Sequence, residues 1–542
     1  MSRATCLALF LTTALAGPAR AATFYVDPQN GSDSGSGSKA SPFKTLQTVV
    51  DSVAKAGDTI LLLSGYYGLL TINGRQNTQH VTIAAAPGAK ARFPRVLVRD
   101  SSYWTLRGLD VSPSYAPTYS KQTMIELQSY NQKGPLEEIV VEDCVLRSVP
   151  DVSGWSDSDW NNKAASGIGV GGTKMTIRNN KVENVNFGIS VGATHSLIKG
   201  NLVKNFSGDG MRGLGDHTVF EGNTVKNCYD VNANHDDGFQ SWTKGSDGKV
   251  GTGQVVGVVL RGNLIINYED PKQPYRGTLQ GIGMFDGTFV DWVIENNVII
   301  TDHWHGITLM GAKNCRVVNN TVIDLNTTSP GPPWIRVTNH KDGTPPSGCL
   351  VRNNLATAFT SASTGVTEDH NIKVTSYADH FVDAAGHDLR LIATSAAIDS
   401  GSSQNAPVVD FDGVARPQGK AIDVGAFEWH KGPLPDAAAP KPDSGGSPAP
   451  DGAPAASSDS GAGPAADGAP ILGGDSGSSA SPDSGPQAGS DGASPAADSG
   501  CVDCADDDSL SAGCAVAPGS DSAGSSVILM LLVIGLAQAR RR

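Results

Sequence analysis

The sequence predicts an all-β chain that winds into a right-handed parallel β-helix, followed by a disordered linker and a short C-terminal apolar helix. Two internal repeats predict this fold: one carries an asparagine at a fixed place, and the other is a short strand centred on a glycine. Repeats of roughly 20–45 residues are typical of solenoids, in which each repeat forms one coil.

The first repeat is a β-rich run, an Asn-Asn or Gly-Asn step and a further apolar pair. Its aligned asparagines are Asn180, Asn201, Asn223, Asn263, Asn297, Asn320 and Asn354. They are 21, 22, 40, 34, 23 and 34 residues apart, so the long gaps predict coils that carry loop insertions. Asparagine tolerates the left-handed backbone of a sharp bend, and stacked asparagines can hydrogen-bond from coil to coil.

The second repeat is a short strand in each coil. Its copies are SGIGVGG, FGISVGA, DGMRGLG, DGFQSWT, QGIGMFD and HGITLMG, which start at Ser166, Phe187, Asp209, Asp237, Gln280 and His305. The residue after the glycine is always apolar, and strand alternation points it inward. The residue before the glycine and the second residue after it are therefore predicted to face outward.

The ends of the repeat region favour a closed solenoid over residues 22–432. The stretch from Phe43 to Lys55 has helical spacing and could cap the open end, protecting strand edges. The segments from Ala22, from Leu389 and from Asp410 resemble the opening and closing segments of secreted, pectate-lyase-like β-helix proteins. That resemblance implies the same fold.

Both chain ends indicate export. Residues 1–21 have a charged start, a short apolar stretch and a small-residue cleavage site after Ala19-Arg20-Ala21, which predict a signal peptide. Residues 433–500 are rich in Pro, Ala, Gly, Ser and Asp and predict a disordered linker. Residues 501–542 resemble a myxo-type C-terminal sorting signal, which implies a processing site at Cys514, cell-surface display and membrane contact through this segment alone.

Charge excludes nucleic acid as an expected partner. The net charge is −13, but the stretch 433–524 holds fourteen Asp and one Lys. The body of the chain is therefore close to neutral and offers no basic surface for phosphates. Its four cysteines are too sparse for a disulfide scaffold or a zinc site, although Cys315 and Cys349 share a repeat position and form either a disulfide or two buried thiols. We expect a monomer.

Acidic, basic and aromatic residues gather on the outward side of a few coils. Coils stack about 4.8 Å apart, so Asp209 and Arg212 should lie one coil from Asp237 and Gln240, with Asp236 at the rim. The expected catalytic residues are Asp209, Arg212, Asp236, Asp237 and His305. Substrate contacts are expected from His235, Gln240, Trp242, His303, Arg336 and Lys341.

Three interpretations of these acids stay open. Asp before Gly can simply shape turns. The stretch SGDG…NHDDG resembles the Asp-rich coils of calcium-binding pectate-lyase-like β-helices. That resemblance implies Ca²⁺ held by Asp209, Asp236 and Asp237, and β-elimination of a uronic-acid polysaccharide. Arg212, Lys244 and Lys341 are candidates for the base.

The third interpretation is an inverting glycosidase. SGDG, HDDG, HWHG and WIRVTNHKDG resemble, in order, the motifs of polygalacturonases, although His303 and Trp304 stand where that family has glycine. Carboxyl groups roughly 6.5–9.5 Å apart would then hold the acid and the attacking water. A non-catalytic carbohydrate-binding or adhesive protein is a further class that the sequence leaves open.

Overall fold

The computed structural model describes residues 21–362 and 364–432. The predicted signal peptide, apart from Ala21, the predicted linker and the predicted sorting segment lie outside the described residues. In the described ranges no helix is long and apolar enough to cross a membrane.

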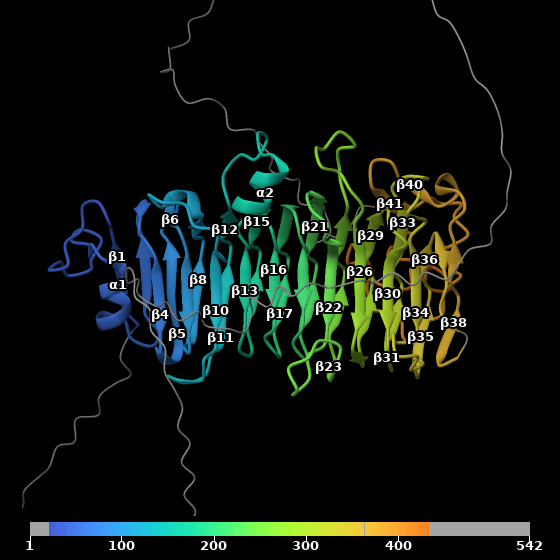
Figure 1. Cartoon of the computed structure of the whole chain (residues 1–542), viewed down its shortest axis with the longest axis horizontal. Helices are drawn as coiled ribbons and strands as arrows, with labels where there is room; N and C mark the ends of the chain where they lie inside the picture. The colour runs from blue at the N-terminus through green and yellow to red at the C-terminus, as the bar shows by residue number, and fades with distance from the viewer. Residues whose placement is uncertain (1–20, 363, 433–542) are drawn as a thin grey trace, which may run out of the picture. The chain divides into compact units, whose positions relative to one another are not determined.

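Three long parallel sheets run side by side along a solenoid, as Figure 1 shows. Sheet 1 has thirteen strands in the described residues: β1 (Thr23–Val26), β2 (Thr59–Leu62), β5 (Gln76–Ala85), β8 (Ser102–Arg107), β11 (Glu137–Glu142), β14 (Thr176–Arg178), β17 (Leu197–Lys199), β20 (Val219–Glu221), β24 (Val259–Arg261), β28 (Val293–Glu295), β32 (Arg316–Val318), β35 (Cys349–Arg352) and β38 (Val366–Asp369). Sheet 2 has eleven: β4 (Leu70–Asn73), β7 (Val96–Arg99), β10 (Ile125–Gln128), β13 (Ile168–Val170), β16 (Ile189–Val191), β19 (Met211–Gly213), β22 (Asp237–Trp242), β26 (Gln280–Asp286), β30 (His305–Met310), β34 (Trp334–Thr338) and β37 (Ala358–Phe359).

Sheet 3 has twelve strands in the described residues: β3 (Gly65–Tyr66), β6 (Ala91–Phe93), β9 (Asp110–Val111), β12 (Val145–Arg147), β15 (Lys181–Val185), β18 (Leu202–Phe206), β21 (Thr224–Cys228), β25 (Leu264–Ile266), β29 (Val298–Thr301), β33 (Thr321–Asp324), β36 (Leu355–Ala356) and β39 (Ile372–Lys373). Each coil passes through sheet 2, sheet 1 and sheet 3 in that order. The described body is the predicted parallel β-helix.

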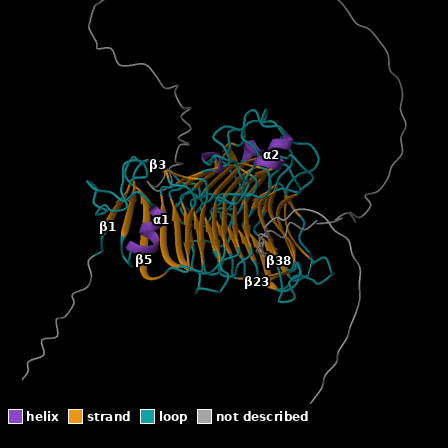
Figure 2. Cartoon of the chain, turned by 60° about the vertical axis from the view of Figure 1, so that its left-hand side comes forward, coloured by secondary structure: helices purple, strands orange, loops and turns teal. Residues whose placement is uncertain are grey.

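Smaller elements decorate the coils. A short parallel sheet joins β23 (Gln254–Val256), β27 (Thr288–Val290) and β31 (Ala312–Lys313), and an antiparallel pair joins β40 (Phe381–Asp383) and β41 (Asp388–Leu391). The helical turns are α1 (Leu46–Thr48), the π-turn η1 (Val49–Val53), η2 (Pro113–Tyr115), α2 (Asp157–Lys163) and η3 (Tyr377–Asp379). Figure 2 shows α1 at one end of the solenoid and α2 among loops along one edge.

The apolar residues that follow the repeated glycines form one stack in the core. The strand register pairs Ile168, Ile189, Met211, Phe239, Ile282 and Ile307 in succession. All six side chains are buried. The inward direction predicted from alternation is therefore confirmed, and each coil buries its apolar side chains against the coils above and below.

The asparagine repeat divides two tasks between neighbouring residues. The left-handed backbone belongs to the residue before each aligned asparagine, such as Asn179, Gly200 and Asn296, with φ of 54°, 63° and 53°. The aligned asparagines themselves are buried and form the ladder: the side-chain amide of Asn180 donates to Asn201 at 3.0 Å, and this contact recurs up to Asn371. The predicted ladder is confirmed, but the predicted bend lies one residue earlier.

The predicted N-terminal cap is helical as α1 and η1. Leu46 and Val50 are buried against the first coils. The side chain of Gln47 donates to the carbonyl of Thr71 at 2.7 Å and accepts its N–H at 3.1 Å. Because β4 is the first strand of sheet 2, this amide occupies the hydrogen-bonding groups that a further strand would otherwise take.

The closing segment covers the outer side of sheet 3. Phe381, Leu391 and Phe427 form a second apolar cluster with Ile300 and Ile323. The insertion around α2 makes a third cluster, in which the buried Trp160 packs on Trp155 and Tyr229. These tryptophans therefore serve local packing.

All four cysteines of the described body are free and buried. Cys315 directly precedes β32 and Cys349 begins the neighbouring strand β35 of sheet 1. Their thiols hydrogen-bond to backbone carbonyls, Cys315 to Phe289 at 3.3 Å and Cys349 to Ser347 at 3.5 Å. Of the two possibilities raised by their shared repeat position, the structure shows the pair of buried thiols.

Candidate functional site

The outer face of sheet 2 carries a continuous column of side chains. The register aligns Gly169, Ser190, Arg212, Gln240, Gly283, Thr308 and Arg336 strand by strand. This is the outward column predicted from the second residue after each glycine, extended by one coil. On the N-terminal side of Arg212 the column holds only the small residues Gly169 and Ser190. The functional side chains of the column therefore begin at Arg212, beside the acids.

Asp209 joins two coils at the centre of this face. Its Oδ2 forms an ion pair with Nε of Arg212 at 2.5 Å, and its Oδ1 accepts the backbone N–H of Asp237 at 3.1 Å. The Arg212 guanidinium lies 3.7 Å from the centre of the Phe187 ring and 5.2 Å from that of Trp242. These contacts bury the Asp209 carboxylate and hold the arginine in place.

Asp237 is a fully buried carboxyl backed by polar neighbours. Its Oδ2 accepts a hydrogen bond from Nε2 of Gln240 at 3.1 Å and lies 3.3 Å from Nδ1 of His235. Burial raises the pKa of Asp237 to about 7, with the Asp209 charge adding to the rise and His235 and Arg212 opposing it. Since the His235 side chain is 53% exposed, the pair links a buried acid to a solvent-accessible imidazole.

A glycine in the next coil makes room for this carboxyl. A Cβ atom at Gly283 would lie 2.2 Å from Oδ1 of Asp237. That oxygen is buried and has no hydrogen-bond partner among the described residues. The ring of Phe285 closes over the same glycine. The site thus holds Asp237 under an aromatic cover, which favours its neutral form.

Asp236 points away from Asp237. Its Oδ2 lies 3.3 Å from Sγ of Cys228, and both side chains are buried. Burial raises the pKa of Asp236 well above its ordinary value, and the charge of Asp209 adds to the rise. Neighbouring residues of an extended chain point to opposite sides, so this acid faces the corner between sheets 2 and 3 and not the exposed rim where it was expected.

The three acids do not converge on one point. Asp209 is held by Arg212, and Asp236 and Asp237 point in opposite directions. In the part of the chain that the structure describes, no group of three or more His, Cys, Asp or Glu is placed to hold a metal ion. A Ca²⁺ ion requires six or more oxygen ligands around one centre, so these side chains as they lie do not fit it.

An aromatic group closes the C-terminal side of the site. It consists of Phe285, His303, Trp304, His305 and Trp334. His305 lies between Phe285 and Trp334, with ring centres 4.9 and 5.4 Å away, and stacks on His303 at 5.1 Å. Trp304 is 38% exposed and stacks on Trp334 at 6.4 Å. These rings offer a wall on which a sugar ring could pack.

The two histidines of this wall are held neutral. Burial lowers the pKa of His303 to about 4 and that of His305 to about 3, with neighbouring cationic groups adding to the shift. The folded state thus binds fewer protons than the unfolded state below pH 6.5, so stability is lost as the pH falls from there toward 3. We expect the midpoint of thermal unfolding to drop over this range, and to drop less in the double variant His303→Gln, His305→Gln. The exposed His370→Gln serves as control, and equal pH slopes in all three proteins would contradict the assignment.

The remaining predicted residues lie at the edges of the site. Arg336 aligns with Thr308, and its guanidinium lies 5.2 Å from the Trp334 ring. Lys341 forms an ion pair with Asp286 at 2.7 Å, so it is not placed to act as a base. Lys244 follows β22 on the exposed surface. Of the expected catalytic residues, the structure brings Asp209, Arg212 and Asp237 together. His235, which was expected to contact substrate, joins them through Asp237. His305 lies on β30, two strands from β22.

Sequence reasoning missed three contributors. The sequence around Cys228 does not predict its contact with Asp236, because this contact depends on the path of the loop between β21 and β22. Phe285 and Trp334 are outward-facing aromatic residues on β26 and β34. Extending the alternation beyond the repeated glycine would have found Phe285.

Comparisons with known proteins support the fold of the chain. A model of the family described as "Right handed beta helix region" matches residues 166–354, in agreement with the right-handed parallel β-helix. No curated protein matches the sequence.

Three solved structures illustrate the structural similarity. The chain is similar to the crystal structure of pectate lyase Pel9A, with 17% identity and a TM-score of 0.41 over 76% of this chain and 96% of that chain. It is similar to XylC in complex with xylose, with 11% identity and a TM-score of 0.43 over 63% and 76%. It is also similar to the A-module of the Azotobacter vinelandii mannuronan C-5 epimerase AlgE4, with 12% identity and a TM-score of 0.34 over 61% and 92%. At this level of similarity, no property of those proteins transfers to this chain.

Proposed function

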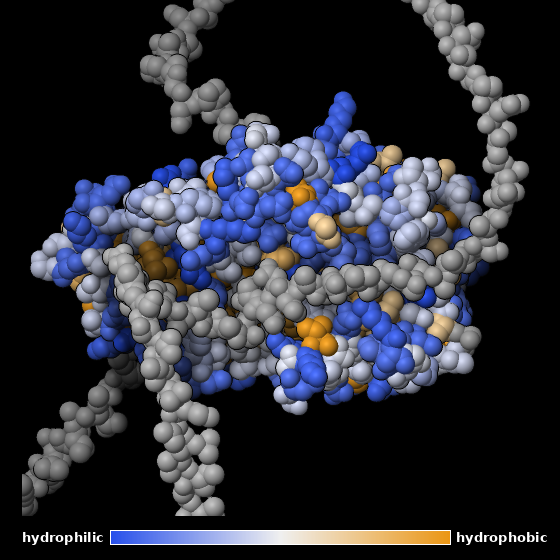
Figure 3. Space-filling model, in the orientation of Figure 1, coloured by the Kyte–Doolittle hydropathy of each residue, from blue (hydrophilic) through white to orange (hydrophobic). Residues whose placement is uncertain are grey.

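We propose that the chain is an enzyme that cleaves an acidic, uronate-containing polysaccharide by β-elimination on the outer face of sheet 2. The observation that carries this proposal is the pairing of the half-exposed His235 with the buried Asp237, beside the Arg212–Asp209 ion pair. Figure 3 shows a mostly hydrophilic surface with scattered apolar spots on the side of the molecule in view. A polymer of acidic sugar rings suits a site that combines Arg212 with the aromatic rings of Trp242 and the exposed Trp304.

In this proposal each residue has one task. Asp237 orients the imidazole through Nδ1, so the other ring nitrogen faces substrate as general base. Arg212 uses Nε for Asp209, which leaves its two terminal nitrogens to bind the uronate carboxylate. Charge neutralisation there acidifies the adjacent C–H bond.

The elimination step balances as follows. The imidazole takes the proton from C5, the C–H electrons form the C4=C5 double bond, and the C4–O bond breaks. The leaving oxygen then takes a proton from the imidazolium or from water. Trp242 and the exposed Trp304 provide flanking surfaces for neighbouring sugar rings. Calcium is not needed for any of these steps.

Hydrolysis is the second candidate, and the raised pKa of Asp237 favours it. A carboxyl whose pKa is about 7 retains much of its proton at neutral pH and can act as general acid. The ion-paired Asp209 would then position water. Because both acids are buried, substrate would have to displace the aromatic cover before reacting.

Product analysis on purified protein separates these activities. The protein is incubated with pectate, alginate and a neutral glycan, with and without a chelator. Elimination predicts an ultraviolet-absorbing unsaturated uronide from an acidic polymer, and no loss of activity with chelator. Reducing ends without that absorbance would favour hydrolysis, and activity that disappears with chelator would restore the calcium interpretation. Retention of polymer without either product would identify a carbohydrate-binding protein and overturn the proposal.

We also propose export and display at the cell surface, on the basis of residues 1–21 and 501–542. Surface labelling of cells that express the whole chain tests this location, with a chain ending at residue 500 as the matched control. Retention of both forms inside the cell would contradict it.

A further inference from the structure

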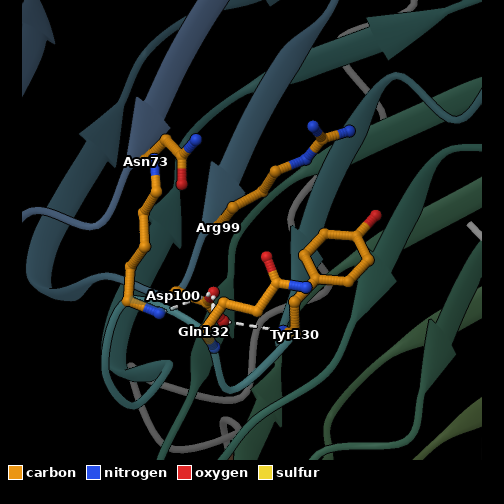
Figure 4. Close-up of a pocket in the computed structure, with 6 residues that line it drawn as sticks. Asn73, Arg99, Asp100, Tyr130 and Gln132 are labelled. Carbon is orange, nitrogen blue, oxygen red and sulfur yellow. Dashed lines mark hydrogen bonds between the residues drawn. The ribbon is translucent and has the colours of Figure 1, made fainter.

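A second polar hollow lies on the N-terminal coils, far along the chain from the acids. It has a volume of about 310 Å³ and is lined by Asn73, Arg99, Asp100, Tyr130, Gln132 and Lys133. Figure 4 shows these side chains side by side, at the ends of neighbouring strands and on one loop. Asn73 and Arg99 align as the last residues of β4 and β7, and Asp100 directly follows Arg99. The loop that follows β10 supplies Tyr130, Gln132 and Lys133.

Asp100 builds the loop. Its two carboxylate oxygens accept the backbone N–H groups of Tyr130, Asn131, Gln132 and Lys133, at distances from 2.6 to 3.2 Å. Burial raises the pKa of Asp100, but these four donors outweigh it and hold the pKa below its ordinary value. The negative charge of Asp100 is thus already used by backbone donors and is a poor partner for the cations beside it.

Two cations in the hollow lack an anionic partner. Among the described residues, neither Arg99 nor Lys133 forms a side-chain hydrogen bond or an ion pair, and Nε of Arg99 is buried without an acceptor. The Arg99 guanidinium instead lies 5.5 Å from the Tyr130 ring centre. The nearby Glu126 is ion-paired to Arg95. Buried donors without acceptors are costly, so the hollow is suited to an anion.

Rigid contacts keep the hollow open. The hydroxyl of Tyr130 donates to Oε1 of Gln128 at 2.6 Å, which fixes a ring that is 39% exposed. The stem of Lys133 passes Gly74, where a Cβ would lie 2.7 Å from the lysine Cδ. The left-handed backbone of Gly74, with φ of 67°, suits glycine as well. An aromatic ring beside the Arg99 guanidinium, with a second cation on the same loop, matches a sugar ring that carries a carboxylate.

We propose that this hollow is a distal binding subsite for a uronate unit of the polysaccharide that is cleaved at the acid cluster. The proposal rests on the proposed function for the identity of the polymer. Five strand steps of sheet 2 separate β7 from β22, which corresponds to about 24 Å at about 4.8 Å per coil. A long chain laid along the sheet reaches both sites, whereas a short oligomer reaches one.

The test measures binding and cleavage separately. The double variant Arg99→Gln, Lys133→Gln is compared with Lys39→Gln, Lys420→Gln, which removes the same charge from exposed positions elsewhere. Binding of long oligouronates is measured in an Asp237→Asn background by calorimetry. We expect the first pair to weaken binding by about tenfold to a hundredfold and the control pair to leave it unchanged. The single variant Lys133→Gln, at an exposed side chain, should lose part of this affinity with an unchanged unfolding midpoint.

Kinetics and competitor polymers complete the test. With the active protein, the first pair should raise KM for long substrate without changing kcat, and should not affect di- or trisaccharides. Unchanged affinity in the first pair, or equal loss for dextran sulfate, would overturn the assignment to a uronate. Oligouronate binding that depends on Arg99 and Lys133 without any cleavage product would support the hollow and refute the enzymatic proposal.

Discussion

Replacing Asp237 by Asn is expected to lower the turnover of acidic polysaccharide by roughly 10²–10⁴-fold, the range that positioned acid–base groups contribute. The carboxyl contacts Nδ1 of His235 and Nε2 of Gln240. The amide of asparagine can present its NH₂ group to Nδ1 of His235, which disfavours the ring orientation in which Nδ1 donates. The neutral amide also does not stabilise the imidazolium that forms when His235 takes up a proton. The measurement is the initial rate of product formation at saturating substrate.

Loss of folding would not explain this result. Burial raises the pKa of Asp237 from 3.8 to about 7, so the folded state binds more protons than the unfolded state between these values. Stability therefore falls as the pH rises through this window. The variant lacks this cost and should unfold at or above the wild-type midpoint at pH 8. Asp247→Asn, in the loop after the same strand, serves as control, and full activity in Asp237→Asn would remove this cluster from consideration.

Replacing Asn297 by Leu is expected to be the most damaging single change to the stack. Its side chain accepts the backbone and side-chain N–H groups of Asn263, both at 3.0 Å, and donates to Oδ1 of Asn320 and the carbonyl of Leu260, both at 2.9 Å. All of these groups lie in the interior. Leucine leaves them without partners, which should destabilise the fold by roughly 3–5 kcal/mol.

Thermal unfolding followed by circular dichroism checks this expectation. The matched control is Asn179→Gly, one residue before the ladder in another coil. Its backbone is left-handed with φ of 54°, and its side chain is exposed. Glycine adopts that conformation freely, so its midpoint should change little. Similar unfolding midpoints for the two variants would contradict the expectation, because they would show that the asparagine ladder contributes no more to stability than the bend residue.

The sequence predicts the parts of the molecule that repeat. The inward column through Ile189 and Phe239 and the asparagine ladder follow from alternation and period alone, because every coil solves the same packing problem. The outward column through Arg212 and Gln240 follows for the same reason. The repeat does not show that Asn179 makes the bend and Asn180 the ladder. Both positions are asparagine in several coils, and the residue type alone does not show which of the two has the left-handed backbone.

Positions outside the periodic stretches could not be predicted. Asp236 stands just before β22, where the chain returns from an insertion, so the direction of its side chain depends on loop geometry and on the thiol of Cys228. The hollow with Arg99 and Tyr130 lies in coils before the first aligned asparagine, where the repeat gives no register. The carboxylate of Asp100 accepts backbone N–H groups of the loop after β10, and the types of the loop residues do not reveal such bonds.

A single glutamine amide also protects the open edge of sheet 2 against pairing with another copy of the chain. Gln47 imitates the missing neighbour of β4 by satisfying both main-chain groups of Thr71. A second molecule that tried to dock end to end would first have to displace that side chain and the apolar turn behind it. Pairing of a further strand with this edge of sheet 2 is thus opposed by a side chain of the same molecule, and the register of the later coils stays as it is.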